Sequence, residues 1–309
     1  MERKEARAIS LHDLGSVTVR EALRDGAEFL SRMGIDRVRL DAELLLGKAL
    51  RCARERLYLD YEAGIEAPVK DLYFSLLQRR ARREPIAYIT GEREFWSLDF
   101  LVTPEVLVPR PETELLVEVT LELVKKSEGH HPVKILDLGT GSGVVAVSLA
   151  KEIDNVEMWA TDLSARALKV AQTNAMRHGV EEKIRFLPGD AFGPVRGQTD
   201  FFNVIVSNPP YVRRGELGSL PPEVREWEPR LALDGGADGL DFYRRVIEEV
   251  DHHLAEGGFV ALEIGADMAE EVRRLIANVG CYCVPSVRRD YAGRDRVVVA
   301  RKLPADAIY

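Results

Sequence analysis

The feature that most constrains the fold is a glycine-rich loop, Gly139–Gly143, set between two apolar segments. The segment before it, Val133–Leu138, has the length and composition of a buried β-strand, and Val144–Ala150 after it reads as the opening of a helix. Glycines let the backbone approach a ligand closely, and the free N–H groups at the start of a helix favour polar or anionic groups. The order of strand, glycine loop and helix therefore predicts a ligand site on an α/β fold.

Helix and strand patterns alternate from Pro111 onward, which indicates a mostly parallel, doubly wound sheet with helices on both faces. Three further strands are predicted at Val156–Thr161, Ile184–Leu187 and Phe201–Ser207. Two late strands, Val284–Val287 and Val297–Ala300, flank a turn rich in Gly and Asp. They predict a terminal antiparallel hairpin that closes the sheet.

Polar or aromatic side chains follow these strands, at the edge where open α/β sheets bind ligands. Asp162 ends the second strand, and its carboxylate can take both hydroxyls of a ribose; alternatively it only caps the helix expected from Ser164. Asp190 and Phe192 follow the third strand, where an acid and an aromatic ring can hold an adenine. The loop also suits a dinucleotide site, but it lacks the wider Gly-x-Gly-x-x-Gly spacing.

The tetrapeptide Asn208-Pro209-Pro210-Tyr211 comes directly after the fourth strand. Two consecutive prolines fix φ and lack N–H groups, so the carbonyls of Asn208 and Pro209 can stand free as acceptors. Asn208 adds a side-chain acceptor and two donors, and Tyr211 supplies a flat ring on which a planar substrate could stack. Such a cluster can hold an –NH2 group by both hydrogens, which favours methylation of a planar nitrogen. The alternative is a proline-rich turn that only ends the strand.

The loop, the two acids and the tetrapeptide occur in the order found in S-adenosylmethionine-dependent methyltransferases that act on exocyclic or amide nitrogen. The chain resembles in particular the peptide chain release factor glutamine methyltransferase family, also called PrmC or HemK. Besides the tetrapeptide, the resemblance rests on Arg79–Gly91, Phe95–Phe100, Val108–Glu114, Trp227–Gly236 and Arg289–Arg296. It implies the fold of S-adenosylmethionine-dependent methyltransferases, with a small helical domain at the N-terminus.

The resemblance also implies a reaction, in which the enzyme methylates the side-chain amide of the glutamine in the Gly-Gly-Gln motif of class I release factors. The candidate cofactor-binding residues are Gly139, Thr140, Gly141, Ser142, Gly143, Asp162, Asp190, Phe192, Asn208 and Phe100. Phe100 is added by the resemblance alone, and it could equally be a core aromatic of a hairpin. Asn208, Pro209, Pro210 and Tyr211 are the candidate substrate-binding residues, and Asn208, Pro209 and Tyr211 among them are the candidate catalytic residues.

Three parts are predicted along the chain. A capping-box pattern at Thr18–Glu21 opens a run of helical patterns that continues to Arg83. Residues 1–85 are therefore expected to form a helical domain, to which the resemblance assigns the binding of the protein substrate. Residues 86–110 are expected to form a hairpin linker, and residues 111–309 the catalytic domain.

Composition narrows the choice of partners and compartment. The 309 residues are 46% apolar and 30% charged, which is typical of a soluble globular protein. A charged N-terminus without an apolar signal core and the lack of a long apolar segment predict a cytoplasmic protein that binds no membrane. The three cysteines are expected to be buried thiols that form no disulfide, and no Cys, His or acid spacing suggests a metal. A net charge of −8 argues against direct binding of nucleic acid.

Three alternatives remain open from the sequence. An adenine-specific DNA methyltransferase presents the same tetrapeptide to a flipped-out base, but it needs a basic cleft and a target-recognition region, and neither is visible. A ribosomal RNA methyltransferase meets the same objection from charge. A non-catalytic S-adenosylmethionine-binding module would be expected to have lost the loop or the tetrapeptide, and both are intact.

Overall fold

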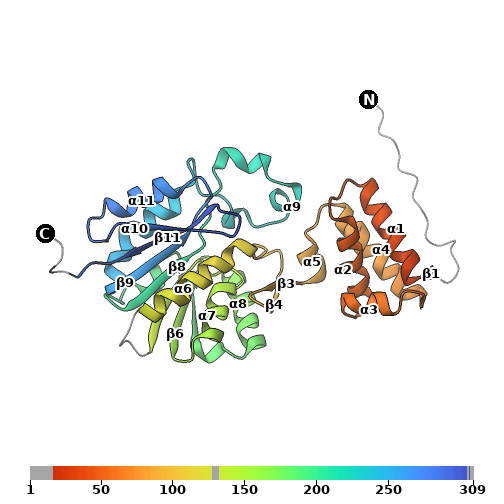
Figure 1. Cartoon of the computed structure of the whole chain (residues 1–309), viewed down its shortest axis with the longest axis horizontal. Helices are drawn as coiled ribbons and strands as arrows, with labels where there is room; N and C mark the ends of the chain where they lie inside the picture. The colour runs from red at the N-terminus through yellow and green to blue at the C-terminus, as the bar shows by residue number, and fades with distance from the viewer. Residues whose placement is uncertain (1–16, 127–131, 305, 307–309) are drawn as a thin grey trace. The chain divides into compact units, whose positions relative to one another are not determined.

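The structure, a computed structural model, describes residues 17–126, 132–304 and 306. The chain divides into two compact units, one that ends at Thr90 and one that begins at Gly91 (Figure 1). The first unit is helical, and the second is built on a seven-stranded sheet. Among the described residues, every helix is too short or too polar to span a bilayer.

The N-terminal unit packs its helices around a leucine-rich core. Leu30, Leu45, Leu57 and Leu77, from four different helices, are buried together in it. The helices are α1 (Val19–Arg32), α2 (Val38–Leu50), α3 (Arg54–Leu59), α4 (Ala67–Ala81) and α5 (Ile86–Thr90), and β1 (Val17–Thr18) pairs with β2 (Gly64–Ile65). Residues Ile86–Thr90, which the sequence placed in a linker, thus form the last helix of this unit.

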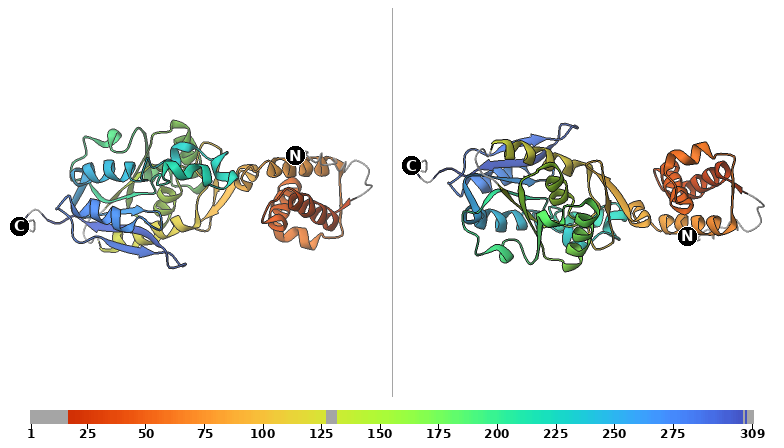
Figure 2. Two further views of the ribbon diagram at one scale, coloured as in Figure 1. Left: turned by 90° about the horizontal axis from the view of Figure 1, so that it is seen from above. Right: turned by 90° about the horizontal axis from the view of Figure 1, so that it is seen from below.

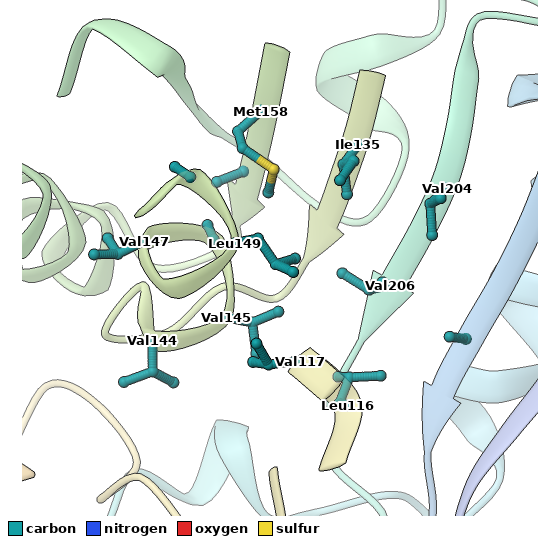
Figure 3. Close-up of a cluster of buried hydrophobic side chains, with 14 of the residues drawn as sticks. Leu116, Val117, Ile135, Val144, Val145, Val147, Leu149, Met158, Val204 and Val206 are labelled. Carbon is teal, nitrogen blue, oxygen red and sulfur yellow. The ribbon is translucent and has the colours of Figure 1, made fainter. Parts of the chain in front are cut away.

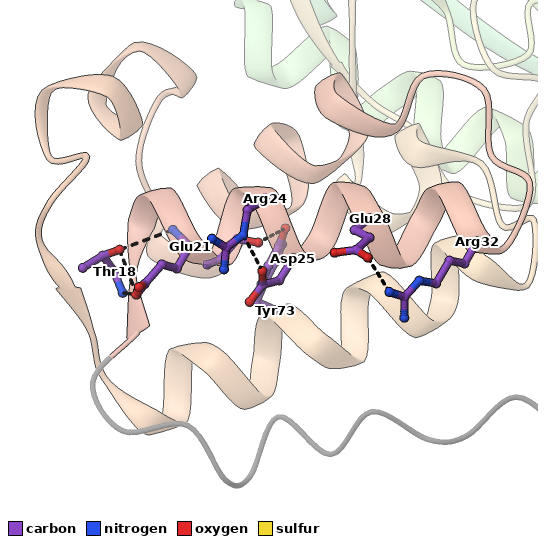
Figure 4. A network of polar contacts seen from close by, with 8 residues as sticks. Thr18, Glu21, Arg24, Asp25, Glu28, Arg32 and Tyr73 are labelled. Carbon is purple, nitrogen blue, oxygen red and sulfur yellow. Dashed lines mark hydrogen bonds and ion pairs between the residues drawn. The ribbon is translucent and has the colours of Figure 1, made fainter.

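Helix α1 begins with the predicted capping box (Figure 4). The Thr18 hydroxyl accepts a hydrogen bond from the Glu21 N–H at 3.3 Å, and the Glu21 carboxylate accepts one from the Thr18 N–H at 2.9 Å. These bonds satisfy two donors that the first helical turn would leave unpaired. Farther along α1, a β-carbon on Gly26 would lie 2.0 Å from the phenol oxygen of Tyr73 in α4. The close crossing of the two helices therefore depends on glycine at position 26.

The larger unit is a sheet with the strand order β10-β11-β9-β8-β5-β6-β7. Its parallel strands are β5 (Val133–Leu138), β6 (Val156–Asp162), β7 (Ile184–Pro188), β8 (Phe202–Ser207) and β9 (Leu254–Glu263). The hairpin of β10 (Ser286–Arg289) and β11 (Asp295–Arg301) runs antiparallel and forms one rim of this unit (Figure 2). The strand order reverses between β5 and β8, which creates a switch point at their carboxyl ends.

Successive side chains of a strand point to opposite faces of the sheet. Both faces of this sheet are apolar, and helices cover both of them. Ile135, Met158 and Val204 face one core, under α6 (Glu114–Lys126) and α7 (Val144–Glu152), as Figure 3 shows. Leu136 and Ile205 face the other core, under α10 (Asp241–His253) and α11 (Ala269–Ala277). Helix α8 (Ala165–His178) contacts β6 and β7. The predicted doubly wound sheet with its closing hairpin is confirmed.

A second hairpin begins the larger unit. Strands β3 (Glu92–Phe95) and β4 (Leu98–Leu101) are antiparallel, and Trp96 and Ser97 turn between them at positive φ. Phe95 and Phe100 meet edge to face with ring centroids 6.1 Å apart, and both belong to the core under α6 and α7. Short helices complete the unit: Pro111–Thr113 (η2), Glu181–Lys183 (η3), Gly193–Val195 (η4), Arg214–Ser219 (η5), Pro222–Arg225 (α9) and Arg230–Ala232 (η6).

Candidate active site

A cavity of about 330 Å³ lies at the carboxyl ends of the parallel strands of the larger unit. The glycine loop after β5, the ends of β6 and β7, the residues after β8 and the start of α10 all contribute to its wall. Its volume is within the range of ligand pockets, and it opens at the switch point where sheets of this kind bind ligands. The cavity is therefore the candidate active site.

The glycine loop leaves space at the cavity for a ligand. Gly139, Gly141 and Gly143 all have positive φ, at 71°, 57° and 82°. A β-carbon on Gly139 or Gly141 would meet no atom within 4 Å, whereas one on Gly143 would lie 3.0 Å from the β-carbon of Ala171 in α8. The first two glycines thus keep the backbone accessible, and the third lets the loop pack on a helix. Thr140 and Ser142 also line the cavity.

Asp162 joins the glycine loop to the end of β6. One carboxylate oxygen accepts a hydrogen bond from the Gly141 N–H at 2.9 Å, and the other accepts one from the Ser164 N–H at 2.8 Å. Burial raises the pKa of Asp162, and the two N–H donors act in the opposite direction. Ser164 itself caps α8, with its hydroxyl 3.1 Å from the Ala167 nitrogen. Each oxygen of Asp162 keeps a lone pair that a ligand hydroxyl can use.

Asp137 is a second acid of the cavity, which the sequence patterns did not single out. Its carboxyl accepts a hydrogen bond of 2.7 Å from the Thr140 hydroxyl. Complete burial raises the pKa of Asp137 to about 7, despite this bond. The signal that could have revealed it is an acid inside an apolar strand pattern, two residues before the glycine loop begins.

The third predicted acid, Asp190, lines the cavity and forms an ion pair of 2.6 Å with Arg245 of α10. The aromatic rings predicted beside it are not among the lining residues. Phe192 is buried and stacks on His253 with ring centroids 4.6 Å apart, and Phe100 is buried under the β3–β4 hairpin. Phe242, from α10, lies in the cavity wall instead. The sequence pattern after the third strand could not show that Phe192 turns into the core, and it gave no sign of Phe242, which reaches the wall from a helix far along the chain.

The tetrapeptide places Asn208, Pro209 and Pro210 in the cavity wall. The Asn208 amide nitrogen donates a hydrogen bond of 3.0 Å to the Thr113 hydroxyl. Within the described part of the chain, no hydrogen bond occupies the Asn208 side-chain oxygen or the Pro209 carbonyl. Two acceptors are thus available at the position where the sequence predicted them.

Unlike the other three residues of the tetrapeptide, Tyr211 does not line the cavity. Its ring packs against the core under α10, and a β-carbon on Gly265 would lie 3.5 Å from it. A β-carbon on Gly235 would lie 2.8 Å from the Tyr211 α-carbon and 2.9 Å from the Pro210 carbonyl oxygen. Burial raises the pKa of the Tyr211 phenol. The two glycines therefore allow the close packing that holds the tetrapeptide in place.

A buried acid, Glu228, joins two segments of the cavity wall that are far apart in sequence. Its carboxylate accepts hydrogen bonds from the Arg110 guanidinium at 2.6 Å and from the Val108 N–H at 3.2 Å. Burial raises the pKa of Glu228, while Arg110 lowers it. Arg110 and the nearby Pro229 both line the cavity. These two segments carried much of the sequence resemblance, and their pairing gives that resemblance a structural reason.

Metal ligation finds no support in the described residues, where no group of three or more His, Cys, Asp or Glu side chains is placed to hold an ion. His130 and His131 lie outside the described residues. The cysteines Cys52, Cys281 and Cys283 are free thiols, but all three are partly exposed and not buried as the sequence predicted.

Family comparisons cover both units. Residues 21–91 match the family described as PrmC N-terminal domain, and residues 112–219 match the one described as methyltransferase small domain. The chain is 43% identical, over 92% of its length and 98% of the relative's, to a release factor glutamine methyltransferase of Moorella thermoacetica. It is 40% identical to one of Geobacter sulfurreducens, over 92% of this chain and 96% of that one.

A solved structure shares the fold at low identity. The catalytic domain of hMettl16, in complex with MAT2A 3′UTR hairpin 6, superposes with a TM-score of 0.55 at 16% identity. The match covers 74% of this chain and 83% of that one, and it shows the fold alone. The resemblance inferred from the sequence is confirmed by the relatives and by both family matches. The chain is a methyltransferase, and it belongs to the release factor glutamine methyltransferase family.

Proposed function

We propose that this protein transfers a methyl group from S-adenosylmethionine to the side-chain amide nitrogen of the glutamine in the Gly-Gly-Gln motif of class I release factors. The observation that carries the proposal is the presence, in one cavity, of an open glycine loop with its two acids and of the free acceptors at Asn208 and Pro209. The names of the relatives support release factors as the substrate.

The cavity residues fit S-adenosylmethionine. Asp162 keeps acceptor capacity for the two ribose hydroxyls, and the open backbone at Gly139 and Gly141 leaves room for the ligand beside it. Asp137 places a carboxyl at the loop, where its negative form would attract a cationic group. Phe242 and Leu231 supply apolar wall for a base. When bound, the cofactor supplies an electrophilic methyl group on a sulfonium.

Asn208 and Pro209 would hold the substrate amide. An amide nitrogen is almost non-basic because its lone pair is delocalised, so positioning must supply much of the rate enhancement. The Asn208 side-chain oxygen and the Pro209 carbonyl can accept the two amide hydrogens and so aim the nitrogen at the methyl group. As the new bond forms, the nitrogen becomes positive and both acceptors bind it more strongly. The proton then leaves to solvent.

The test is to incubate the protein with a release factor and labelled S-adenosylmethionine, and to map the label by mass spectrometry of peptides. We expect one methyl group on the glutamine of Gly-Gly-Gln. A release factor with glutamate in place of that glutamine lacks both amide hydrogens and is the matched control. Label on another residue, or equal labelling of the control, would show that the amide is not the target.

Asn208→Ala is expected to lower kcat by roughly a hundredfold or more, because it deletes an acceptor that strengthens as charge develops on the nitrogen. The affinity for S-adenosylmethionine, measured by calorimetry, should change far less. Asn208→Asp keeps the shape but removes the donors and adds a negative charge, so it should bind the cofactor tightly and still methylate poorly. Near-normal kcat in Asn208→Ala would contradict the amide-clamp mechanism.

The helical unit, residues 1 to about 85, is proposed to bind the release factor, with residues 86–110 as a connection to the catalytic domain at 111–309. This proposal places the protein in the cytoplasm, where translation ends. Direct contact with nucleic acid is not part of it, since the net charge is −8.

A further inference from the structure

A buried polar chain runs from Asn208 away from the cavity. The Asn208 amide nitrogen donates to the Thr113 hydroxyl at 3.0 Å, and the Thr113 side chain hydrogen-bonds the carboxyl group of Glu263. Asn208 directly follows β8, Thr113 ends η2 and Glu263 ends β9. Thr113 and Glu263 are 2% and 1% exposed, so solvent cannot replace either partner.

Burial of the Glu263 carboxyl group is energetically unfavourable for the fold. Among the described residues, one of its carboxyl oxygens is buried without a hydrogen-bond partner. Burial raises the pKa of Glu263 to about 7. An apolar side chain would fill the same position without the penalty of a buried acid. Carboxyl groups with such perturbed titration gather at functional sites, and this one lies two hydrogen bonds from the candidate substrate acceptor.

The hydrogen-bonding capacity of each group gives the chain a direction. A threonine hydroxyl has one hydrogen to donate and lone pairs to accept, so on its own it could face either end of the Asn208 amide. A carboxylate can only accept, and it therefore takes the hydroxyl hydrogen of Thr113. The hydroxyl is then left as an acceptor, which only the NH2 end of Asn208 can satisfy. As a result, the Asn208 oxygen is turned toward the cavity.

We propose that Thr113 and Glu263 are positioning residues, which fix the orientation of the Asn208 amide so that its oxygen faces the substrate. The inference rests on the proposed role of Asn208 as an acceptor. A protonated Glu263 can donate to Thr113 and free the hydroxyl to donate to the Asn208 oxygen. The Asn208 amide then turns its NH2 group toward the substrate NH2, and the hydrogen bond from the substrate to the Asn208 oxygen is lost.

Several charged groups surround Glu263 and decide where it loses its proton. Arg296 and Arg110 favour its charged form, and Glu112 opposes it. Arg296 is also engaged elsewhere, with Asp290 at 3.2 Å and the Ile264 carbonyl at 3.3 Å.

Two phenols complete these surroundings. Tyr243 donates to the Glu263 backbone carbonyl at 2.7 Å rather than to its carboxyl, and Tyr211 interacts electrostatically with Glu263. With a pKa of about 7, Glu263 is charged above neutrality, so the clamp should be intact at alkaline pH and fail in acid.

The experiment measures kcat against pH, from 6 to 8.5, with release factor as substrate. In the wild type, kcat should fall as the pH drops through about 7. Glu263→Gln can donate as well as accept, so at pH 8.5 its kcat should be about tenfold or more below that of the wild type, and its profile should lack the inflection that comes from Glu263, with KM little changed. Thr113→Val should behave in the same way. Thr113→Ser, which keeps the hydroxyl, should recover most of the loss. The double variant Glu263→Gln/Thr113→Val should lose no more than either single variant, since both changes break one chain.

Two controls separate positioning from support of the fold. Glu112→Gln removes a neighbouring exposed acid without breaking the chain, and it should keep the inflection and move it to lower pH. Thermal unfolding at pH 8 should show Glu263→Gln to be no less stable than the wild type, because the change removes a buried charge; a loss of stability would indicate a structural role.

The proposal is overturned if Glu263→Gln keeps the wild-type profile, or if its loss lies in KM. Asn208→Ala, measured in parallel, separates the two levels of the argument. If Asn208→Ala is inactive while Glu263→Gln is normal, only the positioning chain is wrong. If Asn208→Ala is active, the proposed function of the site is wrong as well.

Discussion

Asp162 is half-buried at the cavity, Asp137 and Glu263 are fully buried, and each of these three carboxyl groups has a different set of hydrogen-bond partners. Asp162 accepts from two backbone N–H groups, Asp137 accepts from the Thr140 hydroxyl, and Glu263 has an oxygen without a partner in the described part of the chain. The donors determine how much of the cost of burial is offset. Asp137 and Glu263 both have a pKa of about 7, so each carboxyl group is partly protonated and partly ionised at neutral pH.

Asp162→Ala should weaken the binding of S-adenosylmethionine by roughly 1.5–3 kcal/mol, the usual cost of losing hydrogen bonds to a charged group. The change also releases the Gly141 N–H and so loosens the glycine loop. Calorimetric titration measures the affinity. Asp162→Asn keeps one acceptor oxygen, so its affinity should lie between those of the wild type and Asp162→Ala. An unchanged affinity would leave Asp162 with the sole task of tying the loop to β6.

The free energy of unfolding should respond to pH through Asp137. Its folded pKa of about 7 lies above its ordinary value of 3.8, so the folded state binds more protons than the unfolded chain between about pH 4 and 7. Stability from this group therefore falls as the pH rises through that window, by up to roughly 4 kcal/mol. Urea unfolding should show Asp137→Asn gaining stability over the wild type from pH 5 to pH 8. A difference that does not vary with pH would contradict this account.

At the scale of elements, the patterns that predicted structure correctly were those with a local cause. The capping box at Thr18 and the strand before the glycine loop both formed where expected. The late strand predicted from Val284 begins instead at Ser286, because Pro285 has no N–H to give to the ladder. The side chains that back Asn208 could not be predicted, since Thr113 and Glu263 reach it from segments brought together only by the folded sheet.

The crossing of α1 and α4 leaves no room for a β-carbon at position 26. Gly26→Ala should destabilise the N-terminal unit by about 1–3 kcal/mol, because the new methyl group would overlap the Tyr73 phenol, despite the better helix propensity of alanine. Tyr73→Phe removes the overlapping oxygen, so the double variant should be more stable than Gly26→Ala alone. Urea unfolding followed by circular dichroism measures both. Equal stability of Gly26→Ala and the wild type would show that the crossing can relax.

At the scale of the whole molecule, the cavity and every residue that lines it belong to the unit that begins at Gly91. No described residue of the N-terminal unit is among the lining residues, and residues 21–91 match the family described as PrmC N-terminal domain. A domain that accompanies the catalytic unit without lining its cavity is suited to binding the protein substrate. If the helical unit binds the release factor and the other unit binds the cofactor, as proposed, the two affinities can be measured independently.

A chain of residues 91–309 should bind S-adenosylmethionine with the affinity of the full chain, while its KM for release factor rises by about tenfold or more, equivalent to at least ~1.4 kcal/mol of binding free energy. A short peptide that contains Gly-Gly-Gln is the matched substrate, because it is too small to reach a second binding surface. Both chains should methylate the peptide at the same rate, so that the difference appears only with the intact release factor. Equal KM for release factor in the two chains would give the helical unit a purely structural role. A loss on the peptide as large as the loss on the protein would instead show that the helical unit supports the catalytic site itself.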